Sequence, residues 1–333
     1  MSLLGRDFLQ ESDFTAAEFT ALLDRARAVK AERQSGTEQP RLIGKHLALI
    51  FEKSSTRTRI AFEVAAAQQG ARTTILEPGS SQIGLKESIA DTAKVLARIF
   101  DAIEYRGARH ADLLELAEAA DVPVYNGLTD DWHPTQVLAD FMTMRQAQPD
   151  GPLSYAYVGD ARFNMGNSLL VMGAIMGADV RIVAPRELWP SAPVIAIAQD
   201  RAAASGAQVT ITDDPDEGLV GAGFVHTDVW VSMGEPADAW DERVGLLRGY
   251  RVDAALMART GRPDTRFMHC LPAYHDQLTT VGRQVAERFG LTDGVEVSDE
   301  VFQSAASIVF DQAENRMHAT KALLIETLAG PVP

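Results

Sequence analysis

The 333-residue sequence has one cysteine, fewer basic than acidic residues and no long apolar run. The single cysteine, Cys270, excludes an intramolecular disulfide and a multi-cysteine metal cluster. The longest nearly apolar run, residues 169–178, is about half of the ~20 residues that a membrane-spanning helix needs. With 31 basic and 46 acidic residues the net charge is −15, which disfavours nucleic-acid binding because phosphate backbones require a basic face.

The amino-terminal segment does not have the pattern of a targeting peptide. It carries Arg6, Asp7, Glu11 and Asp13 and has no apolar core. A cytoplasmic location is therefore expected, and a single cysteine fits a reducing compartment. The length indicates roughly two domains, and contents of 46% hydrophobic and 23% charged residues are ordinary for a globular protein.

Short apolar runs alternate with amphipathic segments through the first half of the chain. We expect strands over residues 47–51, 73–76, 102–105 and 122–125. We expect helices over residues 57–69, 87–100, 111–120 and 134–146, the last with Pro134 in its first turn. An earlier helix should begin at Thr15, because Thr15 and Glu18 have capping-box spacing and Phe14 and Phe19 could form a hydrophobic staple.

A polar segment with two prolines and a glycine, residues 146–152, is interpreted as a domain hinge. A second alternation follows, with strands expected over 154–158, 180–184, 208–212, 224–227 and 266–268, and helices over 164–176 and 308–328. Repeated strand–helix units predict mostly parallel sheets covered on both faces. The expected fold is therefore α/β, with two doubly wound parallel-sheet domains joined by the hinge and by terminal helices that cross between them. Ligands should bind at the carboxyl ends of strands, between the domains.

The segment from Phe51 to Arg59, with the sequence FEKSSTRTR, is the most informative part of the chain. It lies between a predicted strand and a predicted helix, so its hydroxyls and arginines would gather at a helix amino terminus. Exposed amides and the helix dipole favour an anion there, and arginine adds bidentate recognition of phosphate. The competing interpretation is ordinary capping with solvated arginines. The segment is not a Walker loop, because the required glycines and lysine are missing.

Three further segments place polar side chains after predicted strands or at helix starts. In the run from His133 to Gln136, His133 could polarise a carbonyl and Gln136 could bond an amide, although an ordinary histidine cap at a surface helix is the favoured interpretation of this run taken alone. Asp228 and the Ser-Met-Gly turn at 232–234 could hold an ammonium group and close over a ligand, or form an ordinary loop. Cys270, in the His-Cys-Leu-Pro run, could be a nucleophile or a small buried side chain.

Two common kinds of cofactor site are not indicated. The segment 159–167 lacks the G-x-G-x-x-G spacing of dinucleotide-binding proteins, although Asn167 could reach a ligand from a helix start. The seven histidines are scattered and show no H-E-x-x-H spacing, so no catalytic metal is expected. His269 precedes Cys270 directly and should face the other way along a strand, which weakens a cysteine–histidine dyad.

Taken together, Ser-Thr-Arg-Thr-Arg at 55–59, His-Pro-Thr-Gln at 133–136, Asp228 with Ser-Met-Gly, and His-Cys-Leu-Pro at 269–272 closely resemble ornithine carbamoyltransferases. The resemblance extends over essentially the whole chain. It implies transfer of a carbamoyl group from carbamoyl phosphate to the δ-amine of L-ornithine, giving citrulline and phosphate, without a metal or organic cofactor. It implies a carbamoyl-phosphate domain over residues 1–148, joined by the returning helix at about 308–330, and an ornithine domain over 149–307.

The resemblance also implies roles for individual residues. The carbamoyl-phosphate site would consist of Ser55, Thr56, Arg57, Thr58, Gln82 from a neighbouring subunit, Arg106, His133, Gln136, Cys270, Leu271 and Arg316. Ornithine would be held by Asn167, Asp228, Ser232 and Met233. The catalytic groups would be Arg106, His133, Cys270 and Arg316, and the bond between Leu271 and Pro272 would be cis.

The assembly that the resemblance implies is a homotrimer or a multiple of trimers. It also implies a role in arginine metabolism, with arginine biosynthesis as the expected pathway. The direction of flux and the presence of allostery stay open. Phe163 and Leu85 depart from the polar residues expected at those positions. Transfer to another amine such as putrescine, and a non-catalytic binding homologue, are the alternatives.

Overall fold

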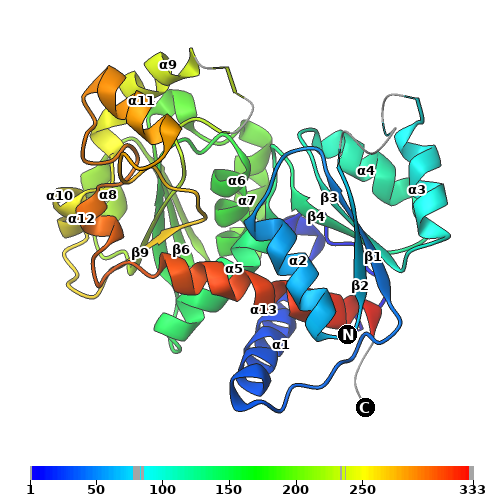
Figure 1. The fold of residues 1–333 in the computed structure, drawn as a ribbon. Coiled ribbons are helices and arrows are strands. Elements are labelled where there is room, and N and C mark those ends of the chain that lie inside the picture. Colours follow the sequence, from blue (N-terminus) through cyan, green and yellow to red (C-terminus); the bar gives the residue numbers. More distant parts are fainter. Residues whose placement is uncertain (1, 78–82, 84–85, 233–234, 237, 330–333) are drawn as a thin grey trace. The chain divides into compact units, whose positions relative to one another are not determined.

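The computed structural model describes residues 2–77, 83, 86–232, 235–236 and 238–329. The chain folds into two compact units (Figure 1). Unit 1 comprises Met1–Thr143 and Glu314–Pro333, and unit 2 comprises Met144–Ala313. The expected α/β fold with two parallel sheets is confirmed.

Unit 1 is built on a four-stranded parallel sheet in the order β2-β1-β3-β4. The strands are β1 (His46–Phe51), β2 (Arg72–Leu76), β3 (Ala102–Arg106) and β4 (Val124–Leu128). The chain passes from β1 to β2 on one side and then returns to β3 on the other. The carboxyl ends of β1 and β3 therefore form a topological switch point, which is where open α/β sheets bind ligands.

Helices α1 (Ala16–Ser35), α2 (Arg57–Gln68), α3 (Ile89–Ala97), α4 (His110–Ala119) and α5 (Pro134–Ala147) accompany this sheet. A buried apolar cluster joins α3 and α4 to one face of the sheet through Ala93, Leu96, Leu113 and Leu116. Burial of such side chains stabilises the fold by roughly 1.5–3 kcal/mol each for the larger ones. The expected proline in the first turn of α5 is confirmed.

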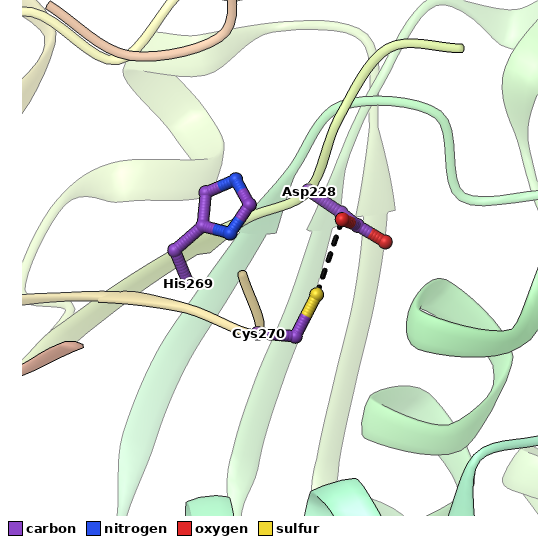
Figure 2. A group of neighbouring side chains, drawn as sticks. All are labelled: Asp228, His269 and Cys270. Atoms are coloured by element: carbon purple, nitrogen blue, oxygen red, sulfur yellow. Dashed lines mark hydrogen bonds between the residues drawn. The ribbon is translucent and has the colours of Figure 1, made fainter. Parts of the chain in front are cut away.

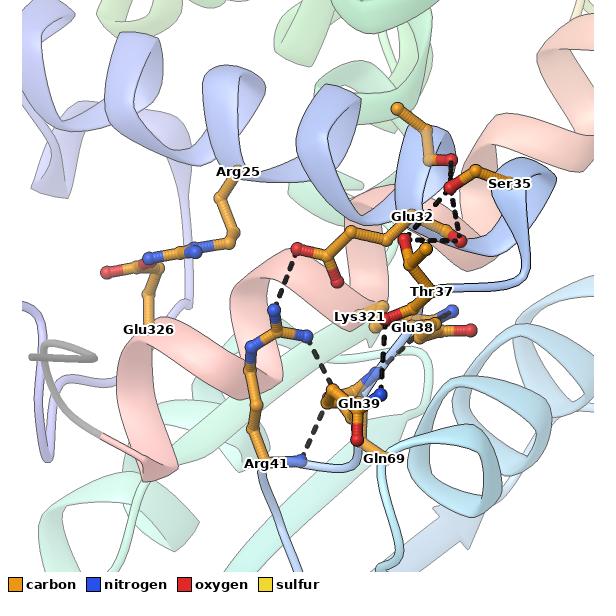
Figure 3. A network of polar contacts seen from close by, with 11 residues as sticks. Arg25, Glu32, Ser35, Thr37, Glu38, Gln39, Arg41, Gln69, Lys321 and Glu326 are labelled. Atoms are coloured by element: carbon orange, nitrogen blue, oxygen red, sulfur yellow. Dashed lines mark hydrogen bonds and ion pairs between the residues drawn. The ribbon is translucent and has the colours of Figure 1, made fainter.

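The amino-terminal helix α1 begins as its sequence predicts. Thr15 and Glu18 form both halves of the capping box, and the Phe14 and Phe19 rings lie 5.6 Å apart. Helix α1 lies beside the carboxyl-terminal helix α13 (Val309–Leu328), and the Arg25 guanidinium of α1 contacts Glu326 of α13 at 2.6 Å. Figure 3 shows the polar network that links these helices with residues 35–41. At its centre Lys321, fully buried, is bonded to Glu38 and, at 2.6 Å, to Gln68.

Unit 2 contains a five-stranded parallel sheet in the order β7-β6-β5-β8-β9. Its strands are β5 (Ser154–Val158), β6 (Asp179–Val183), β7 (Gln208–Thr212), β8 (Phe224–Thr227) and β9 (Arg266–His269). The switch point in this unit lies between β5 and β8. The segments that follow these two strands carry Asn167 and Asp228.

The helices of unit 2 are α6 (Asn164–Ile175), α7 (Ala192–Ser205), α8 (Pro215–Leu219), α9 (Ala239–Leu247), α10 (Ala254–Ala258), α11 (Thr280–Phe289) and α12 (Asp299–Phe302). Short 3₁₀ helices cover Arg186–Leu188 and Arg248–Tyr250 in this unit, and Glu11–Asp13 in unit 1. Every residue of α6 from Met165 to Ile175 is buried. Leu219, Leu256, Val301 and Phe302 bring α8, α10 and α12 into one apolar core with Val158 and Phe267 of the sheet.

Most strands lie within a residue or two of the predicted ranges. The fourth strand is the exception, because it was expected over 122–125 and is found at Val124–Leu128. The strand was predicted to end at residue 125 because Asn126 and Gly127 are uncommon in strands, yet both residues belong to β4. Among the described residues no helix is both long and apolar enough to cross a membrane.

Candidate active site

The segment between β1 and α2 forms a helix amino terminus rich in hydrogen-bond donors. Thr56 is the N-cap residue of α2, and the Ser55 hydroxyl accepts a hydrogen bond from the Thr58 amide at 3.2 Å. Thr56 is exposed and Ser55 and Arg57 are half-buried. The first amides of a helix have no intrahelical partner, and together with the helix dipole they favour an anion.

Thr58 is the point at which distant basic residues converge. Its side-chain oxygen accepts hydrogen bonds from Arg316 Nη2 at 2.7 Å and from Arg106 Nη1 at 3.3 Å. Thr58, Arg106 and Arg316 are 1%, 5% and 3% exposed. Two buried guanidinium groups on one hydroxyl create a strongly positive environment beside the start of α2.

His133 and Gln136 belong to the same cluster. Arg316 Nη1 donates a 2.6 Å hydrogen bond to Gln136 Oε1, and Gln136 Nε2 in turn donates to Asp140 at 2.7 Å. His133 is 4% exposed, and burial together with Arg316, Arg106 and Arg57 holds its pKa well below the ordinary value. The imidazole is therefore neutral at physiological pH and adds no positive charge of its own. A neutral imidazole can still donate one hydrogen bond to a carbonyl oxygen.

Glu104 is a member of this environment that the sequence analysis did not identify. It precedes Arg106 by two residues on β3 and is fully buried. Its carboxyl group occupies space left by Gly127, where a Cβ atom would lie 1.7 Å from Glu104 Oε1. Burial raises the pKa of this carboxyl well above its usual value, against the opposing effect of Arg106 and Arg316. The raised pKa favours the protonated form of Glu104, and that form would leave the positive charge of the arginines available to an anion.

Arg59 does not take part in the cluster. Its guanidinium pairs with Glu63 at 3.3 Å and with Glu77 at 3.1 Å. Of the two arginines in the Ser-Thr-Arg-Thr-Arg run, Arg57 thus contributes to the environment of His133, whereas Arg59 pairs with carboxylates. Gln82 lies outside the described residues, as does Leu85.

In unit 2 a carboxylate and a thiol meet at the carboxyl ends of neighbouring strands. Thr227 of β8 pairs with His269 of β9, so the residues that follow them, Asp228 and Cys270, emerge side by side. The Cys270 thiol points at the carboxylate and donates a 3.1 Å hydrogen bond to Asp228 Oδ1 (Figure 2). The Val229 amide donates to the same oxygen at 2.7 Å. Burial raises the pKa of Asp228, opposed by His269 and the thiol.

His269 contacts the backbone of the next turn. Its Nδ1 accepts a 2.9 Å hydrogen bond from the Leu271 amide, and its Nε2 lies 3.4 Å from Glu296 Oε1. Glu296 also accepts a 2.5 Å hydrogen bond from the Tyr274 amide. Leu271 has a φ of 61°, and the expected cis bond to Pro272 is confirmed.

Asn167 and Ser232 are placed on the segments after β5 and β8. Asn167, 3% exposed, lies in the first turn of α6, as expected, and its Nδ2 lies 3.5 Å from the Arg162 carbonyl oxygen. The Ser232 amide donates a 2.7 Å hydrogen bond to Glu235 Oε2. Phe163 is the N-cap residue of α6, and its ring packs under the Arg162 guanidinium. Met233 lies outside the described residues.

Two groups of described residues bring potential metal ligands within 4.8 Å of one another. One is Asp228, His269 and Cys270, and the other is His275, Asp276 and Asp299. In the first group His269 Nδ1 accepts a backbone hydrogen bond and the thiol donates one to Asp228.

Two family models together match nearly the whole chain. The carbamoyl-P binding domain of aspartate/ornithine carbamoyltransferases matches residues 6–146, and the Asp/Orn binding domain of the same proteins matches residues 152–327. The chain therefore belongs to the aspartate/ornithine carbamoyltransferase family, a family of transferases.

Curated relatives place it closer to one branch of this family. It is 57% identical over 329 residues to a protein of Rhizobium meliloti, with 98% of each chain covered. It is 58% identical over 333 residues to one of Burkholderia mallei, with 99% of each covered. Both relatives are named "Ornithine carbamoyltransferase, catabolic".

Solved structures agree with this placement. The ornithine carbamoyltransferase of Pyrococcus furiosus has a TM-score of 0.90 at 41% identity, with both chains covered completely. The anabolic ornithine carbamoyltransferase of Campylobacter jejuni has a TM-score of 0.85 at 34% identity, covering 96% of this chain and 97% of that one. The resemblance to ornithine carbamoyltransferases drawn from the sequence is thus confirmed.

Proposed function

We propose that the protein transfers a carbamoyl group between carbamoyl phosphate and the δ-amine of L-ornithine. The observation that carries this proposal is the convergence of Arg106 and Arg316 on Thr58, beside a buried neutral His133. Unit 1 thereby offers fixed cationic donors for a phosphate and a neutral donor for a carbonyl oxygen. Names of the curated relatives support the same reaction.

Carbamoyl phosphate is assigned to the amino-terminal domain, residues 1–148 with the returning helix at about 308–330. Ser55, Thr56, Arg57 and Thr58 would hold the phosphate, because they combine hydroxyls, amides and a guanidinium at the start of α2. Arg106 would bridge the phosphate and the carbonyl oxygen.

The carbamoyl group needs donors on its oxygen and acceptors for its amide. His133 and Arg316 would donate to the oxygen, and Gln136 would bond the amide nitrogen. The Leu271 carbonyl would accept a hydrogen bond from the amide or from the incoming amine. Gln82 would reach the phosphate from a neighbouring subunit of a homotrimer.

Ornithine is assigned to the second domain, residues 149–307. Asn167, Asp228, Ser232 and Met233 would hold its α-amino and α-carboxylate groups, and Cys270 would face the δ-amine. The Asp228 carboxylate suits the α-ammonium group of ornithine. Putrescine has no α-amino acid group, so it would leave these residues without a group to bind. This argues for ornithine as the acceptor over the alternative amine.

The reaction follows from these placements. The neutral δ-amine attacks the carbonyl carbon, a C–N bond forms, and the bond from that carbon to the phosphate oxygen breaks. The proton of the attacking amine is transferred to the departing phosphate. Nearby cationic groups favour the neutral form of the amine, and donors on the developing oxyanion are each worth about 10²–10³ in rate. The pathway has no covalent enzyme intermediate, so Cys270 positions the amine; trapping of a carbamoyl-cysteine adduct would overturn this assignment.

The sequence resemblance indicates arginine biosynthesis as the expected pathway and leaves the direction of flux open. The word "catabolic" in the names of the relatives favours the degradative direction of arginine metabolism. In that direction phosphate attacks the carbamoyl carbon of citrulline, and ornithine leaves. The same donors serve both directions, because the transition state is shared. We further propose a cytoplasmic homotrimer or multiple of trimers that needs no metal.

The test is to measure citrulline formation from carbamoyl phosphate with ornithine, putrescine, aspartate, N-acetylornithine and lysine as parallel acceptors. Selective use of ornithine is the expected result. Use of another amine would retain the phosphate assignment and overturn the roles of Asp228 and Ser232. Absence of turnover with any acceptor, in folded protein, would favour the binding homologue. Arsenate- or phosphate-dependent release of ornithine from citrulline measures the reverse direction.

A further inference from the structure

Arg243 of α9 is a buried cation that lies among three carboxylates. Its side chain is 5% exposed. Its Nε lies 2.8 Å from Asp160 Oδ2, its Nη2 donates to Glu235 Oε1 at 2.8 Å, and its Nη1 donates to Glu242 Oε2 at 2.7 Å. The Asp160 and Glu235 side chains are 4% and 19% exposed, whereas that of Glu242 is 62% exposed. The two interior contacts are therefore the ones that solvent screens least.

The contact with Glu235 leads to the segment after β8. Glu235 Oε1 accepts the hydrogen bond from Arg243, and Glu235 Oε2 accepts a 2.7 Å hydrogen bond from the backbone amide of Ser232. A single carboxylate thus connects the guanidinium to the backbone of a residue that we assign to ornithine. Rotation of this carboxylate would break one or both hydrogen bonds.

The contact with Asp160 leads to the segment after β5. Asp160 also receives the Arg162 guanidinium through two hydrogen bonds of 3.0 and 2.7 Å, and the Arg162 amide at 3.2 Å. The carbonyl oxygen of Arg162 is the group near which Asn167 Nδ2 lies. The turn that precedes α6 is therefore fixed to the same guanidinium.

We propose that Arg243 is a positioning residue for the amino-acid substrate, which sets the spacing between the Ser232 and Asn167 segments through Glu235 and Asp160. This proposal rests on the assignment of Asn167 and Ser232 to ornithine. Arg243 itself does not bind the substrate, because its side chain is buried and each of its three nitrogens lies within 2.8 Å of a carboxylate oxygen. Its planar fork fixes two partners at defined angles, which the point charge of a lysine does not do.

The distinguishing variants are Arg243→Lys, which keeps the charge and loses the fork, and Glu235→Gln, which keeps the shape and weakens the link to Arg243. Glu242→Gln is the matched control, since it removes the exposed partner of the same guanidinium. In Arg243→Lys and Glu235→Gln we expect the KM for ornithine to rise at least about tenfold, with the KM for carbamoyl phosphate changed by less than about twofold. The control should change neither constant by more than about twofold.

Amide hydrogen exchange supplies a readout that does not depend on activity. Protection of the Ser232 amide should fall in Arg243→Lys and Glu235→Gln and should be retained in Glu242→Gln, because local opening exposes that hydrogen bond. The ornithine KM effects of Arg243→Lys and Glu235→Gln should also be non-additive in the double variant, whereas those of Arg243→Lys and Glu242→Gln should add.

The proposal is wrong if both constants rise in parallel, if the control behaves like the other two variants, or if Ser232 protection is unchanged. Should Arg243→Lys fail to fold, Glu235→Gln and its control decide the question alone. Failure of the wild-type protein to use ornithine would instead overturn the proposed function, while hydrogen exchange would still test the link between Arg243 and Ser232.

Discussion

Glu104 and Arg106 stand two residues apart on strand β3, and both are buried, at 0% and 5% exposed. Side chains at i and i+2 of a strand share one face, so an acid lies directly beside a proposed phosphate-binding cation. The pKa of Glu104 is raised well above its usual value, mainly by burial. Burial therefore disfavours the charged form of this acid beside the cation, and the contribution of Glu104 to stability depends on pH.

The first prediction concerns Glu104→Gln, which mimics the protonated acid. An acid with a raised folded-state pKa favours folding while it is protonated, and its contribution is lost as pH rises from the unfolded value, about 4.3, to the folded value. The variant should match the wild type near pH 4 and should equal or exceed its stability at neutral pH. Urea unfolding at both pH values measures this difference. A variant that is less stable only at neutral pH would show that Glu104 is ionised.

The second prediction tests the phosphate assignment. Arg57→Ala and Arg106→Ala should each lower kcat by at least about 10²–10³, because each removes a fixed cationic donor from the transition state. Arg59→Ala is the control on the same helix, since its guanidinium pairs with Glu63 and Glu77. Steady-state kinetics with ornithine and carbamoyl phosphate provide the measurement. Near-normal turnover in Arg57→Ala or Arg106→Ala would contradict the assignment.

Local sequence patterns identified the elements well and the long-range contacts poorly. The Thr15–Glu18 capping box and the start of α5 at Pro134 follow from residues a few positions apart, and both are confirmed. The hydrogen bond from Arg316 to Thr58 joins residues 258 positions apart. No periodicity connects them, so only the family resemblance predicts a role for Arg316.

The residues that the sequence patterns did not single out share one physical reason. Glu104, Glu235 and Arg243 owe their importance to burial beside an opposite charge, which depends on tertiary packing. One signal was available for Glu104, because its spacing from Arg106 places both on one face of a predicted strand. The short helices α8, α10 and α12 were not predicted either, since four or five residues carry little periodicity.

The third prediction concerns His226 of β8. Burial and the neighbouring His269 lower its pKa to about 3. A histidine with a lowered folded-state pKa does not reduce stability above its unfolded pKa of about 6.5. As pH falls from that value toward 3, the unfolded state binds a proton that the folded state does not bind, so stability is lost by up to about 1.4 kcal/mol per pH unit. His226→Phe keeps the edge-on ring contact with Tyr155 and removes the titration.

Its pH dependence of stability should accordingly be shallower than that of the wild type between about pH 6.5 and 5. Tryptophan fluorescence is a suitable probe of urea unfolding, because Trp189, Trp230 and Trp240 all lie in unit 2. The comparison is between slopes, so a uniform change in stability from the substitution does not affect it. Equal slopes in the two proteins would show that the pKa of His226 is the same in the folded and unfolded states.

The fourth prediction concerns the buried cation that joins α13 to residues 35–41 in Figure 3. Lys321 is fully buried and its partner Glu38 is 11% exposed, and burial lowers the pKa of the lysine. Lys321→Met leaves the Glu38 carboxylate without this cation, which should cost about 3–5 kcal/mol of unfolding free energy. Exposed Arg27, paired with Asp24, offers the control Arg27→Ala, with an expected loss below about 1 kcal/mol.

The double variant Lys321→Met with Glu38→Gln distinguishes two costs of Lys321→Met. One is the loss of a favourable contact, and the other is a buried carboxylate that has lost its nearest cation. Glu38 accepts a 2.8 Å hydrogen bond from Gln69 Nε2, and a glutamine oxygen can retain it. In Lys321→Met the Glu38 carboxylate keeps one cationic contact, with Arg33 at 3.7 Å. If the cost of the substitution arises from this poorly compensated charge, removing the charge should recover a large part of the stability. Additive losses in the two single variants would show instead that both side chains stabilise the fold independently of each other. Thermal unfolding of the four proteins decides between these outcomes.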